Sequence, residues 1–343
     1  MKITSSLLSI IVVPFLVLTA CQTAPKTTCG PEVRAAFDIG SGSTKMKVGE
    51  YDTCTDKLNK VILEDQAKVN YQESLQASSD QTFSEEVQDA GMAALRSLLE
   101  KALNEKATRF AGVATAAFRK AQNAPEFLSE IDKKLGIHVK VITQEQEAMI
   151  GFKGAASLSQ LPQDKMILWD IGGGSQQMVV LNDKKEPVIY SGTLASVSFK
   201  NYVISRIQKK DTNKVTTPNP LGKKTTAAAS KYAEQHARET VPAEIQLHIK
   251  KKDAAVVGIG GVLSRSIVDQ VTNKTSVTAT EVEQALKKRM DLTDAEIGGE
   301  FVQTEITNLV LVGGFMKALN MNKYQPVKAS LIDGLWYEKD FWR

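Results

Sequence analysis

The fold of this chain is decided by a stretch that occurs twice, FDIGSGSTKMKV at residues 37–48 and WDIGGGSQQMVV at residues 169–180. In each copy an apolar run leads into an aspartate and a glycine-rich turn, and another apolar run follows. This pattern predicts two strand–turn–strand units of the same kind. Because the units lie in mixed α/β surroundings, we expect an α/β protein with two domains related by duplication and a cleft between them.

The remaining segments predict further strands and helices. Apolar residues at roughly helical spacing predict a long helix from Thr82, with Glu85 three residues on as a capping box. A second helix is expected over residues 125–135. Strands are expected over residues 33–39, 46–51, 61–71, 110–114, 138–142, 166–169 and 178–181. Two later apolar runs that end in double glycine are also predicted as strands, VVGIGG at 256–261 and LVLVGG at 309–314.

The composition is that of an ordinary globular protein. The 343 residues are 42% apolar and 24% charged, which is enough for one or two packed domains. A net charge of +4 argues only weakly for an anionic partner. No motif for binding DNA or RNA occurs, so we expect no nucleic-acid partner.

One region, residues 200–252, is rich in lysine. The stretch TTPNPLG (216–222) interrupts it and predicts a surface loop. Two interpretations stay open for the lysines, a solvated face and a track that holds a polyanion. The lysines concerned are Lys209, Lys210, Lys214, Lys223, Lys224, Lys250, Lys251 and Lys252.

Residues 1–20 have the pattern of an export signal. Lys2 precedes an uncharged apolar run over residues 7–20 that is too short to span a bilayer as a helix. The run ends in LTAC (18–21), which resembles the bacterial lipobox. That resemblance implies cleavage before Cys21, lipidation of its thiol and a lipid anchor, with residues 21–32 as a tether. Gln22 favours the outer membrane, so we expect a lipoprotein that faces the periplasm. The alternative is an ordinary signal peptide with an accidental cysteine.

The other two cysteines, Cys29 and Cys54, would lie in a compartment where disulfides persist. If the first unit is a hairpin centred on residues 41 and 42, positions whose numbers add to about 83 face each other. Cys29 and Cys54 add to 83. We therefore predict a disulfide that closes the open end of this hairpin, with two unpaired buried thiols as the alternative.

Both turns have the composition of a phosphate-binding site. A tight glycine-rich turn exposes backbone NH groups on its concave side, glycine permits close approach, and nearby hydroxyl groups add donors. The phosphate-binding residues expected on these grounds are Ser41, Gly42, Ser43, Thr44, Gly172, Gly173, Gly174 and Ser175.

An aspartate stands before each turn, Asp38 in the first copy and Asp170 in the second. A carboxylate at the end of an apolar strand is costly to desolvate unless a cation or a donor meets it. Two carboxylates from opposing domains suit Mg2+, which needs only one or two protein carboxylates beside substrate phosphates and water. We therefore expect Asp38 and Asp170 to bind Mg2+ as the cofactor. The alternative is that each aspartate only caps its own turn.

The duplicated arrangement resembles the actin, sugar kinase and heat-shock ATPase superfold. Two further motifs, ATAAFRKAQN (114–123) and ITQEQEAMIGFKGA (142–155), are similar to those of the exopolyphosphatase and guanosine pentaphosphate phosphatase family. VVGIGG and ASLIDGLWYE (329–338) match its later blocks. The resemblance implies two actin-like (ribonuclease H-like) domains, residues 33–145 and 146–327, with a C-terminal helix over 328–343 joining the first.

The same resemblance implies roles for two more residues. The family's catalytic glutamate falls on Glu147, which would take a proton from the attacking water. The arginine of the second motif falls on Arg119, which would face the substrate phosphate and offset the developing charge.

The sequence departs from the family pattern at three positions. Gly42 replaces an Asn, Gln146 replaces a Glu beside Glu147, and Gln177 replaces the Glu of the second turn. Extracellular nucleoside triphosphate diphosphohydrolases, which share the superfold, carry Gln at the position of Gln177. The resemblance to them adds Gln177 to the substrate site as a residue that orients water.

The expected function is that of an exported, lipid-anchored phosphoanhydride hydrolase of the exopolyphosphatase type. Its substrate would be inorganic polyphosphate or, as the alternative, a nucleoside triphosphate or diphosphate. A noncatalytic phosphate-binding or polyphosphate-binding envelope protein is the second alternative. His138, His236 and His248 show no metal-binding spacing and are interpreted as structural. The oligomeric state stays open, with a homodimer among the expected partners.

Overall fold

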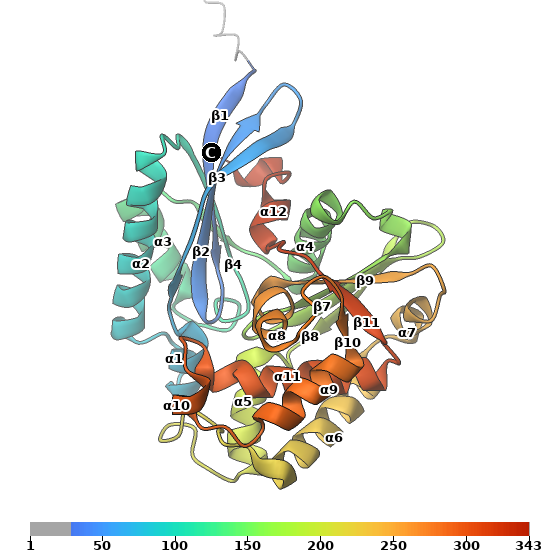
Figure 1. Cartoon of the computed structure of the whole chain (residues 1–343). Coiled ribbons are helices and arrows are strands. Elements are labelled where there is room, and N and C mark those ends of the chain that lie inside the picture. Colours follow the sequence, from blue (N-terminus) through green and yellow to red (C-terminus); the bar gives the residue numbers. More distant parts are fainter. Residues whose placement is uncertain (1–28, 343) are drawn as a thin grey trace, which may run out of the picture.

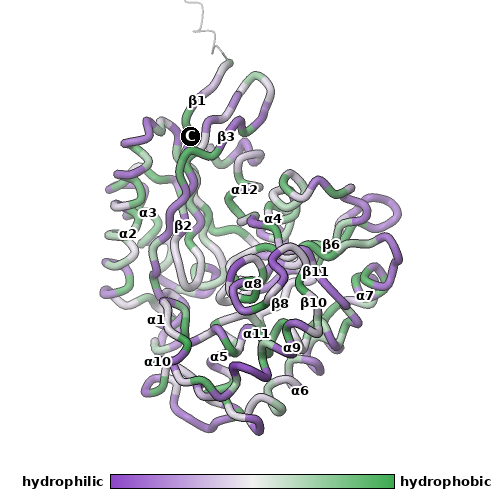
Figure 2. Tube along the Cα trace, in the orientation of Figure 1, coloured by the Kyte–Doolittle hydropathy of each residue, from purple (hydrophilic) through white to green (hydrophobic). Residues whose placement is uncertain are grey.

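The computed structural model describes residues 29–342 as two α/β domains, each built around one sheet (Figure 1). The predicted signal peptide, the predicted lipidation site at Cys21 and most of the predicted tether lie outside the described residues. Within the described part of the chain, no helix is long and apolar enough to cross a membrane. Figure 2 shows that hydrophobic residues concentrate on central strands and that hydrophilic residues follow the outer loops.

Domain I contains a five-stranded sheet in the order β3-β2-β1-β4-β5. Strands β1, β2 and β3 are antiparallel neighbours, whereas β4 and β5 run parallel to β1. Helices α1, α2 and α3 cover one face, where Phe37, Ile39 and Leu95 are buried. The bounds are β1 Pro31–Ile39, β2 Ser43–Asp52, β3 Lys57–Lys68, α1 Tyr71–Ala77, α2 Glu85–Asn104, β4 Arg109–Ala114, α3 Ala124–Leu135 and β5 Val139–Val141.

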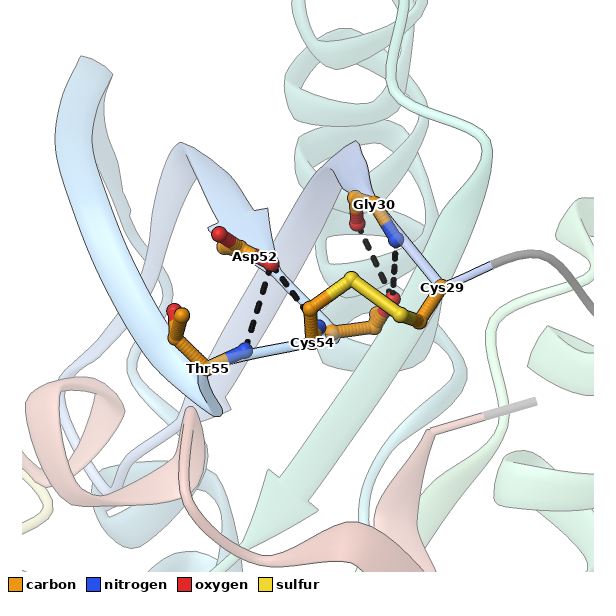
Figure 3. The surroundings of a disulfide bond; sticks show 6 residues. Cys29, Gly30, Asp52, Cys54 and Thr55 are labelled. Atoms are coloured by element: carbon orange, nitrogen blue, oxygen red, sulfur yellow. Dashed lines mark hydrogen bonds between the residues drawn. A yellow bond between two sulfur atoms is a disulfide. The ribbon is translucent and has the colours of Figure 1, made fainter.

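The β1–β2 hairpin has the register on which the disulfide prediction depends. Pro31 faces Asp52 and Asp38 faces Lys45, so the numbers of paired residues add to 83 along the whole ladder. Cys29 and Cys54 continue this register and are joined by a disulfide (Figure 3). The Asp52 carboxylate accepts the backbone NH of Cys54 at 2.8 Å, which fixes the turn at the open end of the hairpin.

Domain II contains a six-stranded sheet in the order β10-β11-β9-β6-β7-β8. Alternate residues of β6 point to opposite faces: Trp169 packs under α5, α6 and α11, whereas Leu168 packs against α4. The bounds are α4 Gln144–Ser159, β6 Met166–Ile171, β7 Gln176–Leu181, β8 Pro187–Gly192, α5 Ser196–Tyr202, α6 Gly222–Thr240, α7 Ala243–Ile249, β9 Ala255–Ile259, α8 Ile267–Gln270, β10 Val277–Thr278, α9 Ala279–Arg289, α10 Asp294–Ile297, α11 Val302–Ala318 and β11 Lys323–Pro326.

The strand predicted over residues 309–314 is wrong, because this segment lies inside the helix α11. Four consecutive residues, 309–312, are fully buried, since α11 packs against helices α5, α6 and α9 as well as the core of domain II. A helix that is buried on all sides reads as a continuous apolar run, which cannot be distinguished from a buried strand by periodicity.

Two smaller predictions are also corrected. Helix α2 begins after Ser84, whose hydroxyl accepts the NH of Val87, whereas the Thr82 hydroxyl donates to Asp80. The strand expected to continue to Tyr71 ends at Lys68, and Tyr71 is the first residue of α1. Both differences concern element ends, where a local hydrogen bond decides between neighbouring start positions.

The C-terminal helix α12 (Leu331–Leu335) packs between α4 and the sheet of domain I (Figure 1). A Cβ atom on Gly334 would lie 1.8 Å from the carbonyl oxygen of Ile150, so only glycine lets α12 approach α4 this closely. On the other side, Asp333 accepts both a 2.9 Å and a 3.0 Å bond from the buried Lys47 ammonium of β2. The last helix therefore connects domain I to α4.

Candidate active site

The two sister turns have the same closing hydrogen bond. In the first turn the Gly40 NH donates to the Ser43 carbonyl at 2.9 Å, and in the second turn the Gly172 NH donates to the Ser175 carbonyl at 2.9 Å. The helix that follows the third strand of each unit contacts the turn: α1 follows β3, and α5 follows β8, where the Ser196 NH donates to the Gly172 carbonyl at 3.1 Å. Near α1 the Gln72 NH donates to the Ser41 carbonyl. The duplicated sequence therefore produces duplicated local geometry.

The turns face each other across the space between the domains. A Cβ atom on Gly174 would lie 2.8 Å from the Ser41 hydroxyl, and one on Gly173 would lie 3.1 Å from the Ser41 Cβ. A cleft of about 440 Å³ opens beside this contact. Its lining includes Asp38, Gly40, Ser41, Gly42, Ser43, Glu147, Asp170, Gly172, Gly173, Gly174 and Ser175. The residues predicted from both copies thus lie in one cleft.

The turns also present free backbone donors. Within residues 29–342, the NH groups of Ser41, Gly42, Gly173 and Gly174 have no hydrogen-bond acceptor. Several of their carbonyl groups accept hydrogen bonds instead: the Gly42 carbonyl accepts from Val69, and the Gly173 carbonyl accepts from the first turn of α5. Unpaired NH groups on a glycine turn form a concave site that favours anionic oxygens. The geometry suits a phosphate group held between the turns.

Asp38, Glu147 and Asp170, among other acidic residues, line the same cleft as these donors. Asp38 lies 3.7 Å from the ammonium of Lys45, which only partly offsets the burial that raises the pKa of Asp38. Burial also raises the pKa of Asp170, to about 7, and the neighbouring charges of Glu147 and Asp38 contribute to this shift. Within the described residues, Asp170 accepts no hydrogen bond and forms no ion pair. Asp170 is therefore a buried carboxylate that no side-chain cation of the described residues pairs with directly.

Glu147 lies in the first turn of α4, where the helix dipole favours a carboxylate. Its Oε2 accepts from the Arg119 guanidinium at 2.8 Å, and its Oε1 accepts from the Ser175 hydroxyl at 3.1 Å. Burial raises the pKa of Glu147, while Arg119 acts in the opposite direction. A buried carboxylate with a raised pKa is suited to general-base catalysis near neutral pH.

Arg119 contacts Glu147 from outside the cleft. This residue does not line the cleft. Its Nη1 donates both to Glu147 and, at 2.9 Å, to the carbonyl oxygen of Ile142. Through these Nη1 contacts Arg119 orients Glu147, and its expected contact with substrate phosphate stays a prediction.

Thr44 and Gln177 are not among the residues that line the cleft. Thr44 is fully buried: side chains alternate along β2, so Ser43 and Lys45 point into the cleft and Thr44 points away. Gln177 pairs with Asp170 in the β6–β7 ladder, and only 1% of it is exposed. Its Nε2 has no partner within the described residues.

The two other departures from the family pattern have local explanations. Gln146 is exposed and completes the capping box of α4: its Oε1 accepts the Thr143 NH at 2.9 Å. Gln146 therefore stabilises the start of the helix that carries Glu147 and does not reach the cleft. A Cβ on Gly42 would meet nothing within 4 Å, so the glycine at this position leaves the cleft more open.

Several cleft residues were not predicted from the sequence. Lys45 stands beside Asp38, and Thr115 lies in the cleft wall at the end of β4. A chain of hydrogen bonds links Ser196 to Asn308 at 2.7 Å and Asn308 to Ser266 at 3.0 Å. Lys45 could have been predicted, because side chains alternate along a strand and Lys45 is two residues after the predicted site residue Ser43. The polar chain gave no sequence signal, because its members lie far apart in the sequence.

The lysines of the 200–252 region do not line the cleft. In the same region, Lys200 is buried and forms a 2.7 Å ion pair with Glu73 of α1, which connects the two domains. The three histidines lie outside the cleft as well. His248, for example, contacts the carbonyl of Glu244 within its own helix.

The donor set of the cleft fits a divalent cation. In residues 29–342, no group of three or more His, Cys, Asp or Glu side chains is arranged to hold a metal ion. Asp38 and Asp170 nevertheless provide two carboxylates, and hydroxyl groups lie next to both turns. A hard cation that keeps most of its waters requires no more than this from the protein.

Comparisons with known proteins agree with this geometry. A model of the Ppx/GppA phosphatase family matches residues 52–305. The structure of the Aquifex aeolicus Ppx/GppA family member is similar to this chain, with a TM-score of 0.68, 18% identity, and coverage of 90% of this chain and 98% of that chain. An exopolyphosphatase from Cytophaga hutchinsonii has a TM-score of 0.69 at 15% identity, covering 90% and 97%.

A nucleoside triphosphate hydrolase from Neospora caninum is a more distant match, with a TM-score of 0.50, 11% identity, and coverage of 87% and 88%. At these identities the structural likeness shows the fold, and it confirms the expected actin-like arrangement of two α/β domains. Because the family model covers most of its length, this chain belongs to the Ppx/GppA phosphatase family and is a phosphoanhydride hydrolase.

Proposed function

We propose that this protein is an exopolyphosphatase-type enzyme that releases terminal phosphate from inorganic polyphosphate. The observation that supports this most is the meeting of two glycine turns with free NH groups and three carboxylates in one cleft. The NH groups suit the oxygens of a terminal phosphate. Phosphoryl transfer depends mainly on such positioning and on stabilisation of charge.

In this proposal Glu147 is the catalytic base. Its carboxylate lines the cleft and takes a proton from the water that attacks the terminal phosphorus. Arg119 is a positioning residue, since its guanidinium holds one carboxylate oxygen while the Ser175 hydroxyl holds the other. These two contacts restrict the carboxylate to one orientation and partly offset the rise in its pKa that burial causes.

We further propose that Asp38 and Asp170 bind Mg2+. The cation would supply charge that offsets the negative charge developing on the phosphate oxygens. The raised pKa of Asp170, about 7, supports this assignment, because a nearby cation would remove the cost of ionising that carboxylate. Gly260 leaves room for the Asp170 carboxylate, because a Cβ atom at position 260 would lie 2.2 Å from Asp170 Oδ1.

The proposed location is the bacterial envelope, with a lipid anchor at Cys21 in the outer membrane and the enzyme facing the periplasm. The disulfide between Cys29 and Cys54 supports an oxidising compartment. Incorporation of labelled palmitate into the wild-type chain, and its loss in Cys21→Ala, would test the anchor. Equal labelling of both chains would contradict it.

A nucleoside triphosphate or diphosphate is the alternative substrate. The Gln177 amide favours it, because its Nε2 is unpartnered and Gln177 lies opposite Asp170 in the sheet. An amide in this position can orient a water molecule beside the cation. The expected consequence is activity on ATP or ADP that is comparable with activity on polyphosphate.

The deciding experiment is a screen for phosphate release by the purified protein. Polyphosphates of several lengths, ATP and ADP are compared with and without Mg2+, and Asp170→Asn serves as the control. We expect Mg2+-dependent release from polyphosphate that is lost in the variant. Release from nucleotides alone would favour the alternative, and turnover that is independent of both Mg2+ and Asp170 would contradict the proposed site.

A further inference from the structure

A second cavity continues from the candidate active site. It has a volume of about 790 Å³ and lies between the β2–β3 edge of domain I and the segment after β9 of domain II. Lys45, Gln66, Gly260 and Arg265 line both cavities, so the two are continuous. We name the second cavity the lysine groove, after Lys45, Lys47, Lys274 and Lys328 in its lining.

The direction of the lysine groove can be followed along β2. Ser43 lines only the cleft, Lys45 lines both cavities, and Lys47 lines only the groove. A chain whose reactive end lies between the turns would therefore pass Lys45 as it leaves. Along β3 the same order holds in reverse, from Glu64 in the groove to Lys68 in the cleft.

The charges of the groove favour a polyanion. Its acidic residues Glu64 and Asp65 are already engaged by Lys47 and Lys101, respectively. Within the described residues, Lys274 and Lys328 have no ion-pair partner. Within the same residues, Arg265 also has no ion-pair partner. Among the acidic residues that line the groove, Asp269 alone has no ion-pair partner there. Within the described residues, three cations without an ion-pair partner therefore stand against one such carboxylate, and the Lys274 ammonium donates only to the Val268 carbonyl.

The part of the cleft beside Lys68 is partly closed by a contact between the domains. There the loop between α10 and α11 reaches domain I, since the Lys68 ammonium donates to the Glu300 carbonyl at 3.0 Å. The Phe301 ring lies beside it, with Lys68 at 5.7 Å and Arg265 at 5.9 Å from the ring centroid. This contact spans the space between the domains, whereas the lysine groove continues away from it.

We propose that the lysine groove binds the distal phosphates of a long polyphosphate chain while its terminal phosphate lies between the glycine turns. This rests on the proposed function. The proposal assigns polyanion binding to Lys274, Lys328 and Arg265 instead of to the lysines of the 200–252 region. Short substrates end before Lys274 and Lys328, so these two lysines select for chain length.

The test is equilibrium binding by titration calorimetry, with turnover measured separately. The double variant Lys274→Gln/Lys328→Gln is compared with Lys223→Gln/Lys224→Gln on α6, which removes two exposed, unpaired lysines outside both cavities. Long-chain polyphosphate and tripolyphosphate are the probes. We expect the groove variant to bind the long chain about fivefold more weakly, from two exposed charge contacts.

The same variant should bind tripolyphosphate as the wild type does, and the α6 variant should bind both probes normally. The affinity difference should shrink at high salt, because exposed charges are screened. Unchanged long-chain affinity, or an equal loss in the α6 variant, would overturn the groove. Lysine-dependent binding by a protein that releases no phosphate would support the groove and overturn the proposed function instead.

Discussion

Replacing Arg119 by glutamine should move the acid limb of the pH–rate profile to higher pH. The guanidinium lies 2.8 Å from Glu147 Oε2, and the two side chains are only 20% and 9% exposed. Burial raises the pKa of Glu147, and Arg119 is the largest influence that lowers it. Without the guanidinium, a larger fraction of Glu147 is protonated at a given pH, and a protonated carboxyl cannot accept a proton from water.

The size of the effect follows from the geometry. Loss of an opposite charge at this distance, in a largely buried pair, should shift the acid limb by about one pH unit or more. One unit corresponds to about 1.4 kcal/mol, so activity below the limb should fall about tenfold. The high-pH plateau should change less, because Glu147 is ionised there in both proteins.

The assay is kcat/KM for phosphate release across the pH range, with Arg119→Lys as the matched control. Lysine keeps the charge, so its limb should lie between those of the wild type and Arg119→Gln. Thermal unfolding of each variant shows whether the fold is retained. An unmoved acid limb with a raised KM for polyphosphate would refute this reasoning, because Arg119 would then contact the substrate.

Three further predictions concern stability. Burial raises the pKa of Asp170 in the folded protein to about 7, above its ordinary value of 3.8, so the stability of the metal-free protein falls as pH rises through this window. Asp170→Asn should therefore raise the thermal unfolding midpoint at pH 8 but not near pH 4. An equal effect at both pH values would contradict this prediction. Gly174→Ala should lower the thermal unfolding midpoint, because the added methyl group would lie 2.8 Å from the Ser41 hydroxyl of the opposing turn. Gly42→Ala should leave the midpoint unchanged, because its methyl group would contact nothing within 4 Å. Equal midpoints for the two variants would contradict the facing arrangement of the turns. Cys54→Ser should lower the unfolding free energy by about 3 kcal/mol in a denaturant titration, since the disulfide joins residues 25 apart, and equal free-thiol counts before and after reduction of the denatured protein would show that no bridge exists.

The fold class could be predicted because the decisive signals are local. A glycine turn between two apolar runs specifies a hairpin and its register, and the register places Cys29 opposite Cys54. The repetition of the same turn predicted the duplicated domains. The helix α11 could not be recognised in the same way, because a fully buried helix has no polar face to give a period.

The roles of individual side chains were harder to predict, because a sequence does not show which way a side chain points. Arg119 was expected at the phosphate, but its guanidinium turns to Glu147 and the Ile142 carbonyl. The lysine-rich 200–252 region was one candidate for a polyanion track, yet the lysines of the lysine groove come from β2 and from loops near residues 274 and 328. These positions meet only through the tertiary fold.

The most direct test of the central claim compares Glu147→Gln with Glu145→Gln. Both changes replace a carboxylate by an amide in the first turn of α4, but Glu145 is exposed and lies outside the cleft. Phosphate release from polyphosphate in the presence of Mg2+ should fall about 100-fold or more in Glu147→Gln and stay near the wild-type rate in Glu145→Gln. Full activity in a folded Glu147→Gln protein would contradict the assignment of this cleft as the place where water is activated.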